Sequence, residues 1–468
     1  MSTILFFDDW NLSSYANLVR KMGKPVWDRE AVLEDETTEG TWNFPFVYFD
    51  HHHKKWKAVY GGVTGHNKYI DCSRYGGDVC YMKDAKLRTG PARGIYPALN
   101  QSLLYAESED GRHWYKPKLN NGKKGLQPNE VLPVSKNGGP VFYDPHEPSG
   151  RKYKFVYSGE GSYLYLASSA DCIHWEINKI GSTRQWDSPI TAFYNANRQC
   201  YYIVTRALGP ERKIYFYKTK DFREIEEPEL VVHPDPEDPP LTEFYGMPVY
   251  AYENMYIGLL WRILPDPGEH GCVKTFGPVD CALAYSYDGR GFNRAYHSAF
   301  IPVNDRGEHG GGGVYTGAMC VAPDHTIRFY SGGSKAEHFQ NQKLRDAGLI
   351  LHTMRLDGFM YFETWSMTGI LTTRCVRFTG NGLKLNVKAP YGAVRAQLAD
   401  NFGKPYQGFS FKDCIPFTGD DLFHQPKWKN GKTPEILRAK RHVQIQVEIT
   451  SGSLYAIRGD FELLRSRH

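Results

Sequence analysis

The stretch Ser108-Glu-Asp-Gly-Arg-His-Trp114 carries the turn on which the fold prediction rests. An Asp-Gly pair favours a tight hairpin, and the aromatic residue four places after the aspartate can pack back onto the sheet. Four further segments repeat this order of an aspartate followed, four residues on, by an aromatic or apolar residue. The five aspartates are Asp110, Asp171, Asp221, Asp288 and Asp357, which stand 61, 50, 67 and 69 residues apart. A repeat at this interval indicates one structural unit used five times.

Each turn follows two short runs of β-forming residues. Before Asp171, for example, lie Pro140-Val-Phe-Tyr143 and Tyr153-Lys-Phe-Val-Tyr157, and runs of the same kind precede the other four turns. Two to four strands in a unit of roughly 50–70 residues match a propeller of four-stranded blades closed radially. The sequence therefore predicts an all-β fold with a five-bladed β-propeller. The alternative is an ordinary pair of β-sandwiches in which Asp-Gly hairpins recur by chance.

The repeat stops after Tyr361, although alternating segments such as Val443-Gln-Ile-Gln-Val-Glu-Ile449 continue. Alternation of apolar and polar residues is typical of a half-buried strand. We therefore predict two domains, the five-bladed propeller in residues 1–365 and a C-terminal β-sandwich in residues 366–468. The pattern requires no helix, although Asn11–Met22 can form a short one.

Composition limits the partners of the chain. Its 468 residues carry a net charge of only +5 and no long basic run, so we do not expect nucleic acid as a partner. No segment approaches 18 consecutive apolar residues, which predicts a soluble protein without a membrane partner. The sequence as given shows no signal peptide, so we expect a periplasmic or secreted protein if a leader was removed and otherwise a cytoplasmic one. The oligomeric state is left open.

We expect no metal ion and no cofactor. The nine cysteines are scattered and never spaced as Cys-x-x-Cys, so neither a zinc site nor a full disulfide framework follows. The run His51-His52-His53 alternates faces on a strand or turn and provides no fixed set of ligands. The glycines from Gly310 to Gly313 lack the Lys-Ser/Thr ending and the following helix of a phosphate-binding loop.

The hairpin Ser108–Trp114 matches in full the Ser-x-Asp-Gly-x-x-Trp hairpin of certain propeller enzymes. On this motif the chain resembles the five-bladed propeller glycoside hydrolases of families 32 and 43. It is also similar, almost throughout, to poorly characterised bacterial proteins with a family-32-like propeller and a C-terminal β-sandwich. The shared motifs are Arg355-Leu-Asp-Gly-Phe359, Gly408-Phe-Ser410 and Asp413-Cys414. The resemblance implies a glycosidase that cleaves a polysaccharide or oligosaccharide by carboxylate acid/base catalysis at the propeller axis.

Hydrolysis of a glycosidic bond needs a proton donor and a second carboxylate in one pocket. In a propeller, this pocket lies where the innermost strands begin. Asp187 precedes the third of these strands and resembles the residue that modulates the acid in family 43. Glu243 precedes the fourth strand, 56 residues later, and resembles the general acid. The simpler alternatives are that Asp187 caps a turn and that Glu243 pairs with an arginine on an exposed loop.

The related families place a third carboxylate at the start of the first blade, where this chain has Thr41-Trp-Asn-Phe-Pro45 and no aspartate. Glu39 lies a few residues upstream and is our candidate for this role. Glu36, Asp35 and Asp9 are substitutes, and any of these residues can instead solvate a loop. The departure leaves open whether the reaction retains or inverts configuration, uses another nucleophile, or is a phosphorylase or transferase reaction.

Aromatic and basic residues near these carboxylates are candidates for substrate binding. Trp42, Trp186 and Tyr245 are expected to stack on a sugar face, while Arg206, Arg262 and His338 are expected to bind hydroxyl, carboxylate or sulfate groups. Structural ion pairs explain the arginines almost as well.

A carbohydrate is thus the expected partner, and an insertion from Asp71 to Gln101 would favour exo action if it walls the pocket. Two other functions compete with the glycosidase. One is a carbohydrate-binding propeller that has lost catalysis, and the other is a scaffold for protein partners.

Overall fold

The computed structural model is all-β, which confirms the predicted fold class. Among the described residues, the regular elements are β-strands, with the exception of one short 3-10 helix, η4 (Pro434–Leu437). The structure describes residues 2–35, 44–63, 68–71, 79–80, 88–89, 95–98, 101–119, 127–135, 137–158, 163–181, 189–206, 211–265, 277–338 and 347–464. No helix in this part of the chain is long and apolar enough to span a bilayer.

The chain divides into two compact units. The repeat unit comprises Pro25–Asp324 and Arg328–Thr353, and the terminal unit comprises Met1–Lys24, His325–Ile327 and Met354–His468. The prediction assigned residues 1–365 to one domain and residues 366–468 to the other. In the structure, the unit that contains the C-terminal residues also contains Met1–Lys24 from the start of the chain.

Pairing of the N-terminal strands explains this difference. Strand β1 (Ser2–Ile4) pairs with β32 (Gln444–Leu463), and β2 (Leu12–Ala16) and β3 (Val19–Met22) pair with β29 (Met360–Thr373). The prediction of a short helix at Asn11–Met22 is therefore wrong. The residues of this segment satisfy their backbone groups across a sheet instead of along a helix.

The remaining strands of the terminal unit are β30 (Val376–Ala399) and β31 (Phe417–His424). The seven strands form one sheet with β32 between β29 and β30. Of the predicted strand Val443–Ile449, residues 444–449 form the start of β32, and Val443 makes an isolated bridge with Val376. Long strands with register shifts, as between Lys388 and Ala393 of β30, can bend a single sheet back over its own core.

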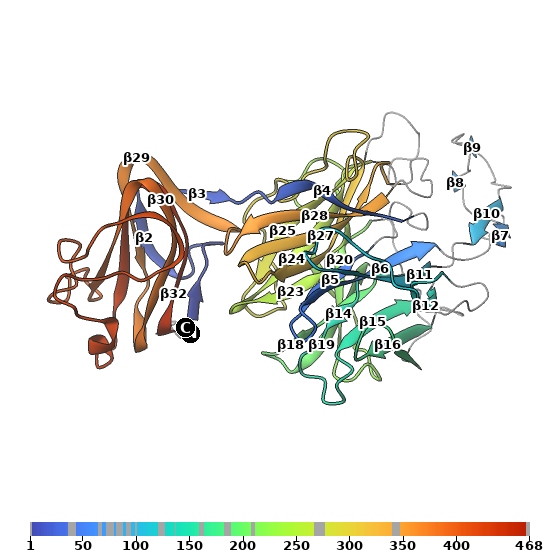
Figure 1. Ribbon diagram of the computed structural model, residues 1–468, viewed down its shortest axis with the longest axis horizontal. Helices are drawn as coiled ribbons and strands as arrows, with labels where there is room; N and C mark the ends of the chain where they lie inside the picture. The colour runs from blue at the N-terminus through green and yellow to red at the C-terminus, as the bar shows by residue number, and fades with distance from the viewer. Residues whose placement is uncertain are drawn as a thin grey trace. The chain divides into compact units, whose positions relative to one another are not determined.

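Three sheets of the repeat unit follow one another along the chain, each of antiparallel strands (Figure 1). The first contains β5 (Phe46–Asp50), β6 (Lys55–Val63), β11 (Gln101–Ser108) and β12 (Glu130–Ser135). The second contains β13 (Asn137–Gly138), β14 (Phe142–Tyr143), β15 (Tyr153–Ser158), β16 (Leu164–Ser169) and β17 (Trp175–Lys179). The third contains β18 (Thr191–Asn195), β19 (Cys200–Arg206), β20 (Ile214–Thr219) and β21 (Glu229–Val232).

A fourth, eight-stranded sheet consists of two groups joined by a single parallel bridge between Val279 and Gly313. One group contains β22 (Glu243–Gly246), β23 (Val249–Tyr252), β24 (Met255–Ile263) and β25 (Val279–Ser286). The other contains β26 (Gly313–Val321), β27 (Thr326–Ser334), β28 (Ala347–Arg355) and, from the N-terminal part, β4 (Val26–Glu34). Between β6 and β11 the chain inserts the small pairs β7 (Lys68–Asp71) with β10 (Ile95–Ala98) and β8 (Val79–Cys80) with β9 (Arg88–Thr89).

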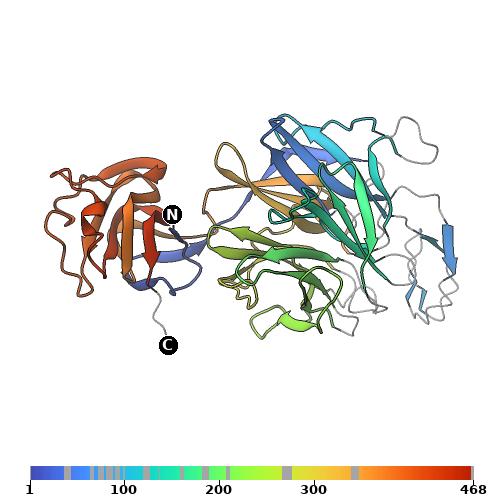
Figure 2. The same ribbon diagram turned by 90° about the horizontal axis from the view of Figure 1, so that it is seen from below.

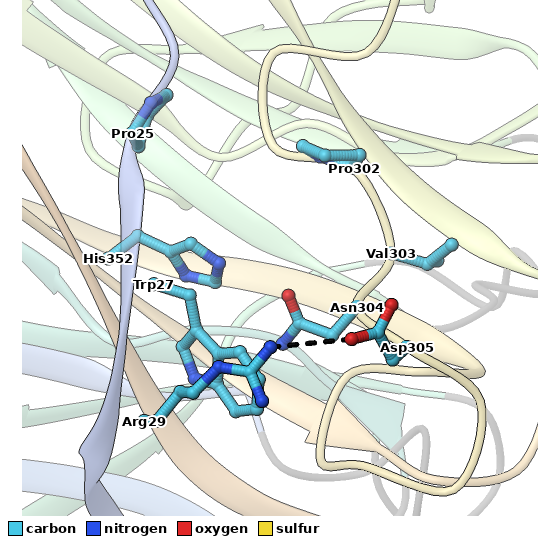
Figure 3. Close-up of a pocket in the computed structure, with 8 residues that line it drawn as sticks. All are labelled: Pro25, Trp27, Arg29, Pro302, Val303, Asn304, Asp305 and His352. Atoms are coloured by element: carbon cyan, nitrogen blue, oxygen red, sulfur yellow. Dashed lines mark hydrogen bonds and ion pairs between the residues drawn. The ribbon is translucent and has the colours of Figure 1, made fainter.

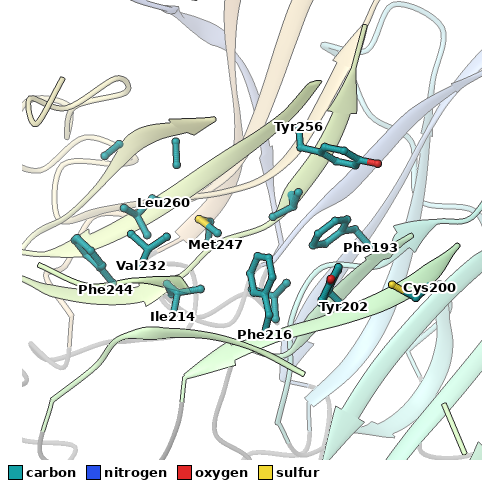
Figure 4. Close-up of a cluster of buried hydrophobic side chains, with 14 residues drawn as sticks. Phe193, Cys200, Tyr202, Ile214, Phe216, Val232, Phe244, Met247, Tyr256 and Leu260 are labelled. Carbon is teal, nitrogen blue, oxygen red and sulfur yellow. The ribbon is translucent and has the colours of Figure 1, made fainter. Parts of the chain in front are cut away.

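Apolar clusters lie between successive strand groups. Phe155 packs with Phe46 between the second and first groups, and Figure 4 shows the cluster between the third and fourth groups, where Phe216 lies near Phe193 and Met247. A further cluster joins Tyr330 of β27 to Trp56 of β6 and thus the last group to the first. This cyclic order of contacts is what a propeller requires, and the number of five blades stays a prediction.

Strand β4 adds to the closure of the repeat unit. It pairs antiparallel with β28, from Gly348 opposite Glu34 to Thr353 opposite Val26. Residues 26–34 and 348–353 therefore share the last strand group although they stand at opposite ends of the unit. Such pairing leaves fewer unpaired edges exposed to solvent.

The turn at Ser108–Trp114 is stabilised by side-chain hydrogen bonds. Asp110 Oδ1 accepts the backbone N–H groups of Arg112 and His113 at 2.8 and 2.9 Å, and Ser108 Oγ accepts that of Gly111 at 2.8 Å. The turns at Asp171 and Asp288 repeat these contacts, and at Asp221 a threonine replaces the serine. The residue after each aspartate is left-handed, with φ of 74° at Gly111, 66° at Cys172, 64° at Phe222 and 70° at Gly289.

The fifth predicted turn is different. Asp357 itself has φ of 60°, and its buried carboxylate pairs with Arg458 and accepts a hydrogen bond from Asn386 Nδ2 at 3.1 Å. All three residues belong to the terminal unit. The fifth turn therefore differs from the other four in two ways: the aspartate itself is the left-handed residue, and its carboxylate pairs with a buried arginine.

Candidate active site

Residues at the start of an innermost strand lie opposite those at the end of the next strand. In the fourth group, Glu243 pairs with Ile263 and Phe244 with Arg262. In the third group the second strand, β19, ends at Arg206, and in the group of β26, β27 and β28 the first strand begins at Gly313. Because neighbouring groups share this polarity, their polar side chains can collect at one end of the repeat unit.

Glu243 is a buried carboxylate at this end, with 5% of its surface exposed. It forms an ion pair with Arg212, which lies two residues before β20. The backbone carbonyl of Arg212 also accepts a hydrogen bond from Phe244 N at 3.0 Å. The pairing with an arginine matches the simpler alternative for Glu243, but Glu243 is buried and Arg212 is half-buried, so the pair does not lie on an exposed loop.

Tyr245 contacts two other predicted site residues, Arg206 and His338. The guanidinium of Arg206 lies 4.6 Å from the centre of its ring, and the ring of His338 meets it edge-on at 4.8 Å. Glu243 stands two residues earlier on the same strand. Tyr245 is 3% exposed and its neighbours cover it, so in this structure it offers no open face for stacking on a sugar.

Tyr315, on β26, completes this cluster and was not predicted. Its ring lies 5.9 Å from that of Tyr245 and 5.7 Å from that of Trp261. Burial and the neighbouring Tyr245 raise the pKa of Tyr315 well above its usual value, although Arg212 opposes the shift. Within the described residues its hydroxyl has no hydrogen-bond partner. The sequence signal for Tyr315 was its place just after the glycine run that begins an innermost strand.

Arg262 makes contacts that favour a structural role. Its Nε and Nη2 atoms each donate to Asp280 at 2.8 Å, its Nη1 donates to the carbonyl of His297, and Asp238 lies 3.8 Å away. Burial raises the pKa of Asp280, against the effect of Arg262, which is itself 3% exposed. These contacts support the ion-pair alternative for Arg262 over substrate binding.

One group among the described residues has the spacing of metal ligands, namely Asp235, Asp238 and His297. Arg294 donates to Asp238 at 2.6 and 2.8 Å and to Asp235 at 2.5 Å. Burial acts to raise the pKa of Asp235, but hydrogen bonds, of which the largest in effect is that of His297, lower this pKa to about 2. Since a buried guanidinium already neutralises these carboxylates, the group is better explained as an ion-pair network than as a metal site.

Two of the substitutes for Glu39 have structural partners. Asp35 is buried, accepts a hydrogen bond from Tyr60 Oη at 2.7 Å and pairs with Lys116 at 2.9 Å. Asp9 belongs to the terminal unit and pairs with Arg20. The other predicted site residues, Glu39 with its substitute Glu36, Trp42, Trp186 and Asp187, lie outside the described residues.

No family model and no curated protein matches the chain. Among solved structures, the β-1,2-mannobiose phosphorylase from Listeria innocua, complexed with β-1,2-mannobiose, is similar at 12% identity and a TM-score of 0.49, over 74% of this chain and 98% of that one. The catalytic domain of the Coprinopsis cinerea GH62 α-L-arabinofuranosidase is similar at 11% identity and a TM-score of 0.43, over 71% of this chain and 97% of that one. An N-acetylgalactosamine deacetylase from F. plautii, complexed with blood group B trisaccharide, is similar at 13% identity and a TM-score of 0.45, over 74% of this chain and 97% of that one. Likenesses this distant carry no argument about the reaction.

Proposed function

We propose that the protein is a five-bladed propeller glycosidase that cleaves a polysaccharide or oligosaccharide with Glu243 as the proton donor. The observation that carries the proposal is a buried carboxylate at the start of an innermost strand, paired with Arg212 and two residues before Tyr245, whose ring contacts Arg206 and His338. The hairpin resemblance of Ser108–Trp114 supports the same class of enzyme. Glycosidases use a carboxyl side chain as the proton donor to the leaving oxygen, and a glutamate can supply it.

In this reaction Glu243 protonates the leaving oxygen as the bond between that oxygen and the anomeric carbon breaks. Glu39 is the proposed second carboxylate, which either attacks the anomeric carbon or takes a proton from the attacking water. Asp187 is proposed to modulate the acid. A separation of about 5 Å between the two catalytic carboxyl groups would correspond to retention and one of about 6.5–9.5 Å to inversion.

Substrate binding is assigned to residues around these carboxylates. Arg206 and His338 are proposed to bind hydroxyl groups or an acidic substituent of the sugar, and Trp42 and Trp186 to stack on its ring. Tyr245 supports Arg206 and His338 through its ring and is assigned a positioning role instead of direct stacking.

The ion pair with Arg212 favours a second candidate, a propeller that binds carbohydrate without cleaving it. A guanidinium on the carboxylate must shift when Glu243 takes up or releases a proton. If it does not shift, the site binds sugar and performs no chemistry.

A screen of the full-length protein against polysaccharides and aryl glycosides tests the proposal. Release of reducing sugar by the wild type, lost in Glu243→Gln and kept in the surface control Glu226→Gln, is the expected result. Glu226 pairs with Lys218 and its side chain is 58% exposed. Binding of a sugar without release supports the second candidate, and release that depends on added inorganic phosphate indicates a phosphorylase. Unchanged turnover by Glu243→Gln would refute the assignment of the acid.

A further inference from the structure

Tyr315 carries a hydroxyl group that the fold buries without a partner. The residue is 0% exposed, and within the described residues no atom forms a hydrogen bond with its Oη. A buried polar group without a partner costs free energy, so such groups are rare in folded proteins and call for an explanation. Tyr315 stands on β26 and Glu243 on β22, both in the repeat unit (Figure 2).

The hydroxyl lies at the end of the sheet where Glu243 begins its strand. Glu243 pairs with Ile263, and Ile263 pairs with Val279. Val279 forms the bridge to Gly313, so Glu243 and Gly313 stand at one level across the sheet. The ring of Tyr315 folds back over Gly313, where a Cβ atom would lie 3.3 Å from Oη. The glycine thus makes room for the phenol at the level of Glu243.

Aromatic rings enclose the phenol and keep ligands away from it. The ring centres of Phe44, Tyr245 and Trp261 lie 6.3, 5.9 and 5.7 Å from that of Tyr315. The hydroxyl oxygen itself has almost no accessible surface. A cavity of about 310 Å³ beside His352, at the β4 and β28 edge, has none of these rings in its wall (Figure 3). The group that pairs with the hydroxyl is therefore to be sought among the side chains around it.

Arg212, the ion-pair partner of Glu243, is a charged group within range of this hydroxyl. Burial and Tyr245 raise the pKa of Tyr315, and the positive charge of Arg212 opposes the rise. The backbone of Arg212 is held, because its carbonyl accepts a hydrogen bond from Phe244 N, but its side chain is 15% exposed and has several rotatable bonds. A phenol oxygen can accept a hydrogen bond from a guanidinium N–H.

Further ionisable groups surround this pair and form a constant background to its titration. Arg206 and His338 contact the ring of Tyr245, and Arg294 lies 5.1 Å from the ring of Phe244. The sequence neighbours of Arg212, which are Glu211 and Lys213, pair with each other at 2.7 Å. A change confined to the hydroxyl of Tyr315 leaves all of these contacts in place.

We propose that Tyr315 is a positioning residue that accepts Arg212 from Glu243 whenever Glu243 holds its proton. The inference rests on the proposed function of Glu243 as the acid. In the charged state Arg212 pairs with Glu243, and when the carboxyl group takes up a proton the guanidinium donates to Tyr315 Oη instead. As the proton passes from Glu243 to the leaving oxygen, the carboxylate that forms regains Arg212, which stabilises it. A carboxylate that is paired in the resting protein can thus act as an acid.

The test measures the protonation of Glu243 in the full-length protein and needs no substrate. Glutamate is labelled with carbon-13 at the side-chain carboxyl carbon, and the Glu243 resonance is the one that Glu243→Gln lacks. We expect the midpoint of its pH titration to fall by about one pH unit in Tyr315→Phe, a tenfold change in the protonation equilibrium. The midpoint falls because the hydroxyl stabilises only the protonated form, by holding Arg212 away from the carboxylate.

The control is Tyr330→Phe, which removes another buried hydroxyl, one that donates to the carbonyl of Gly111 at 3.0 Å. This control should lose stability and leave the midpoint unchanged. Tyr315→Phe should be at least as stable as the wild type, because its hydroxyl has no partner to lose. The two variants therefore separate a structural effect from an effect on Glu243.

A double variant tests whether the effect acts through Arg212. In Arg212→Met, the addition of Tyr315→Phe should no longer move the midpoint, and an equal shift with and without Arg212 would overturn the proposal. An unchanged or higher midpoint in Tyr315→Phe alone, as a buried water on the hydroxyl would give, also overturns it and decides the matter if Arg212→Met does not fold. A protein that shows the expected shift but cleaves no glycoside would contradict the proposed function and not the role of Tyr315.

Discussion

The ion pair between Glu243 and Arg212 is the contact on which most of the candidate site depends, because Glu243 is buried and its partner Arg212 is half-buried. Removing one partner of a buried pair leaves an uncompensated charge, which costs about 3–5 kcal/mol. We therefore expect Arg212→Met to lower the free energy of unfolding by about this amount. The double variant Arg212→Met with Glu243→Gln should recover part of the loss, as measured by denaturant unfolding. Additive effects in this double-mutant cycle would contradict the pair.

A second residue-scale prediction concerns His352. Burial lowers its pKa from the usual 6.5 to about 4, so the folded protein resists protonation that the unfolded chain accepts. This stability is present above pH 6.5 and is lost as the pH falls through about 4, by about 3 kcal/mol in all. We expect His352→Phe to flatten the decline in unfolding free energy between pH 6.5 and 4. The exposed control His233→Gln should retain the wild-type decline, and an equal decline in all three proteins would contradict the assignment.

At the scale of single elements, Gly289 and Gly291 of the turn at Asp288 can be compared with Gly150, which lies between β14 and β15. Gly289 has φ of 70°, and a Cβ there would approach Asn195 Nδ2 to 2.5 Å, whereas Gly150 has φ of 81° and an open surrounding. Gly291 has neither constraint. We expect Gly289→Ala to lose about 2–4 kcal/mol and Gly150→Ala about 1–2 kcal/mol, with Gly291→Ala near neutral, in thermal and chemical unfolding. Similar losses at all three positions would show that the turn conformation does not matter.

The elements were predictable where side chain and backbone favoured the same conformation. The Ser-x-Asp-Gly motif caps its own turn, so Ser108, Asp110 and Gly111 could be assigned from local order alone. The segment Asn11–Met22 could not, because its strands exist only through pairing with residues some 350 positions later. Local propensity gives no information about such partners.

The candidate site was predictable only in part for the same reason. Glu243, Tyr245 and Arg206 stand at strand ends that the repeat makes recognisable, and His338 follows four residues after the end of β27. Arg212 carries no motif, and its importance follows from a contact with a residue 31 positions away. The buried partner of Arg262 was equally hidden, since Asp280 lies on the next strand.

At the scale of the whole molecule, the cluster between the last and first strand groups predicts how the repeat unit unfolds. Leu33 of β4 is buried in this cluster with Trp56 and Tyr330. A charge at position 33 opens the closure, and we expect Leu33→Asp to lower hydrogen-exchange protection in all strand groups of the repeat unit. Strands β29, β30 and β32 of the terminal unit should keep their protection. A loss confined to β4 and β28 would show that closure is not cooperative.

The central claim, that Glu243 donates a proton to the leaving oxygen, is tested most directly by varying the leaving group. Kinetics of the wild type and Glu243→Gln are compared on an aryl glycoside with a dinitrophenolate leaving group and on an alkyl glycoside of the same sugar. A nitrophenolate leaves without protonation, whereas an alkoxide needs it, and general acid catalysis contributes about 10²–10⁴-fold. The account predicts that the variant loses about that factor in kcat/KM on the alkyl glycoside and far less on the aryl one. Equal losses on both substrates, or none, would contradict it.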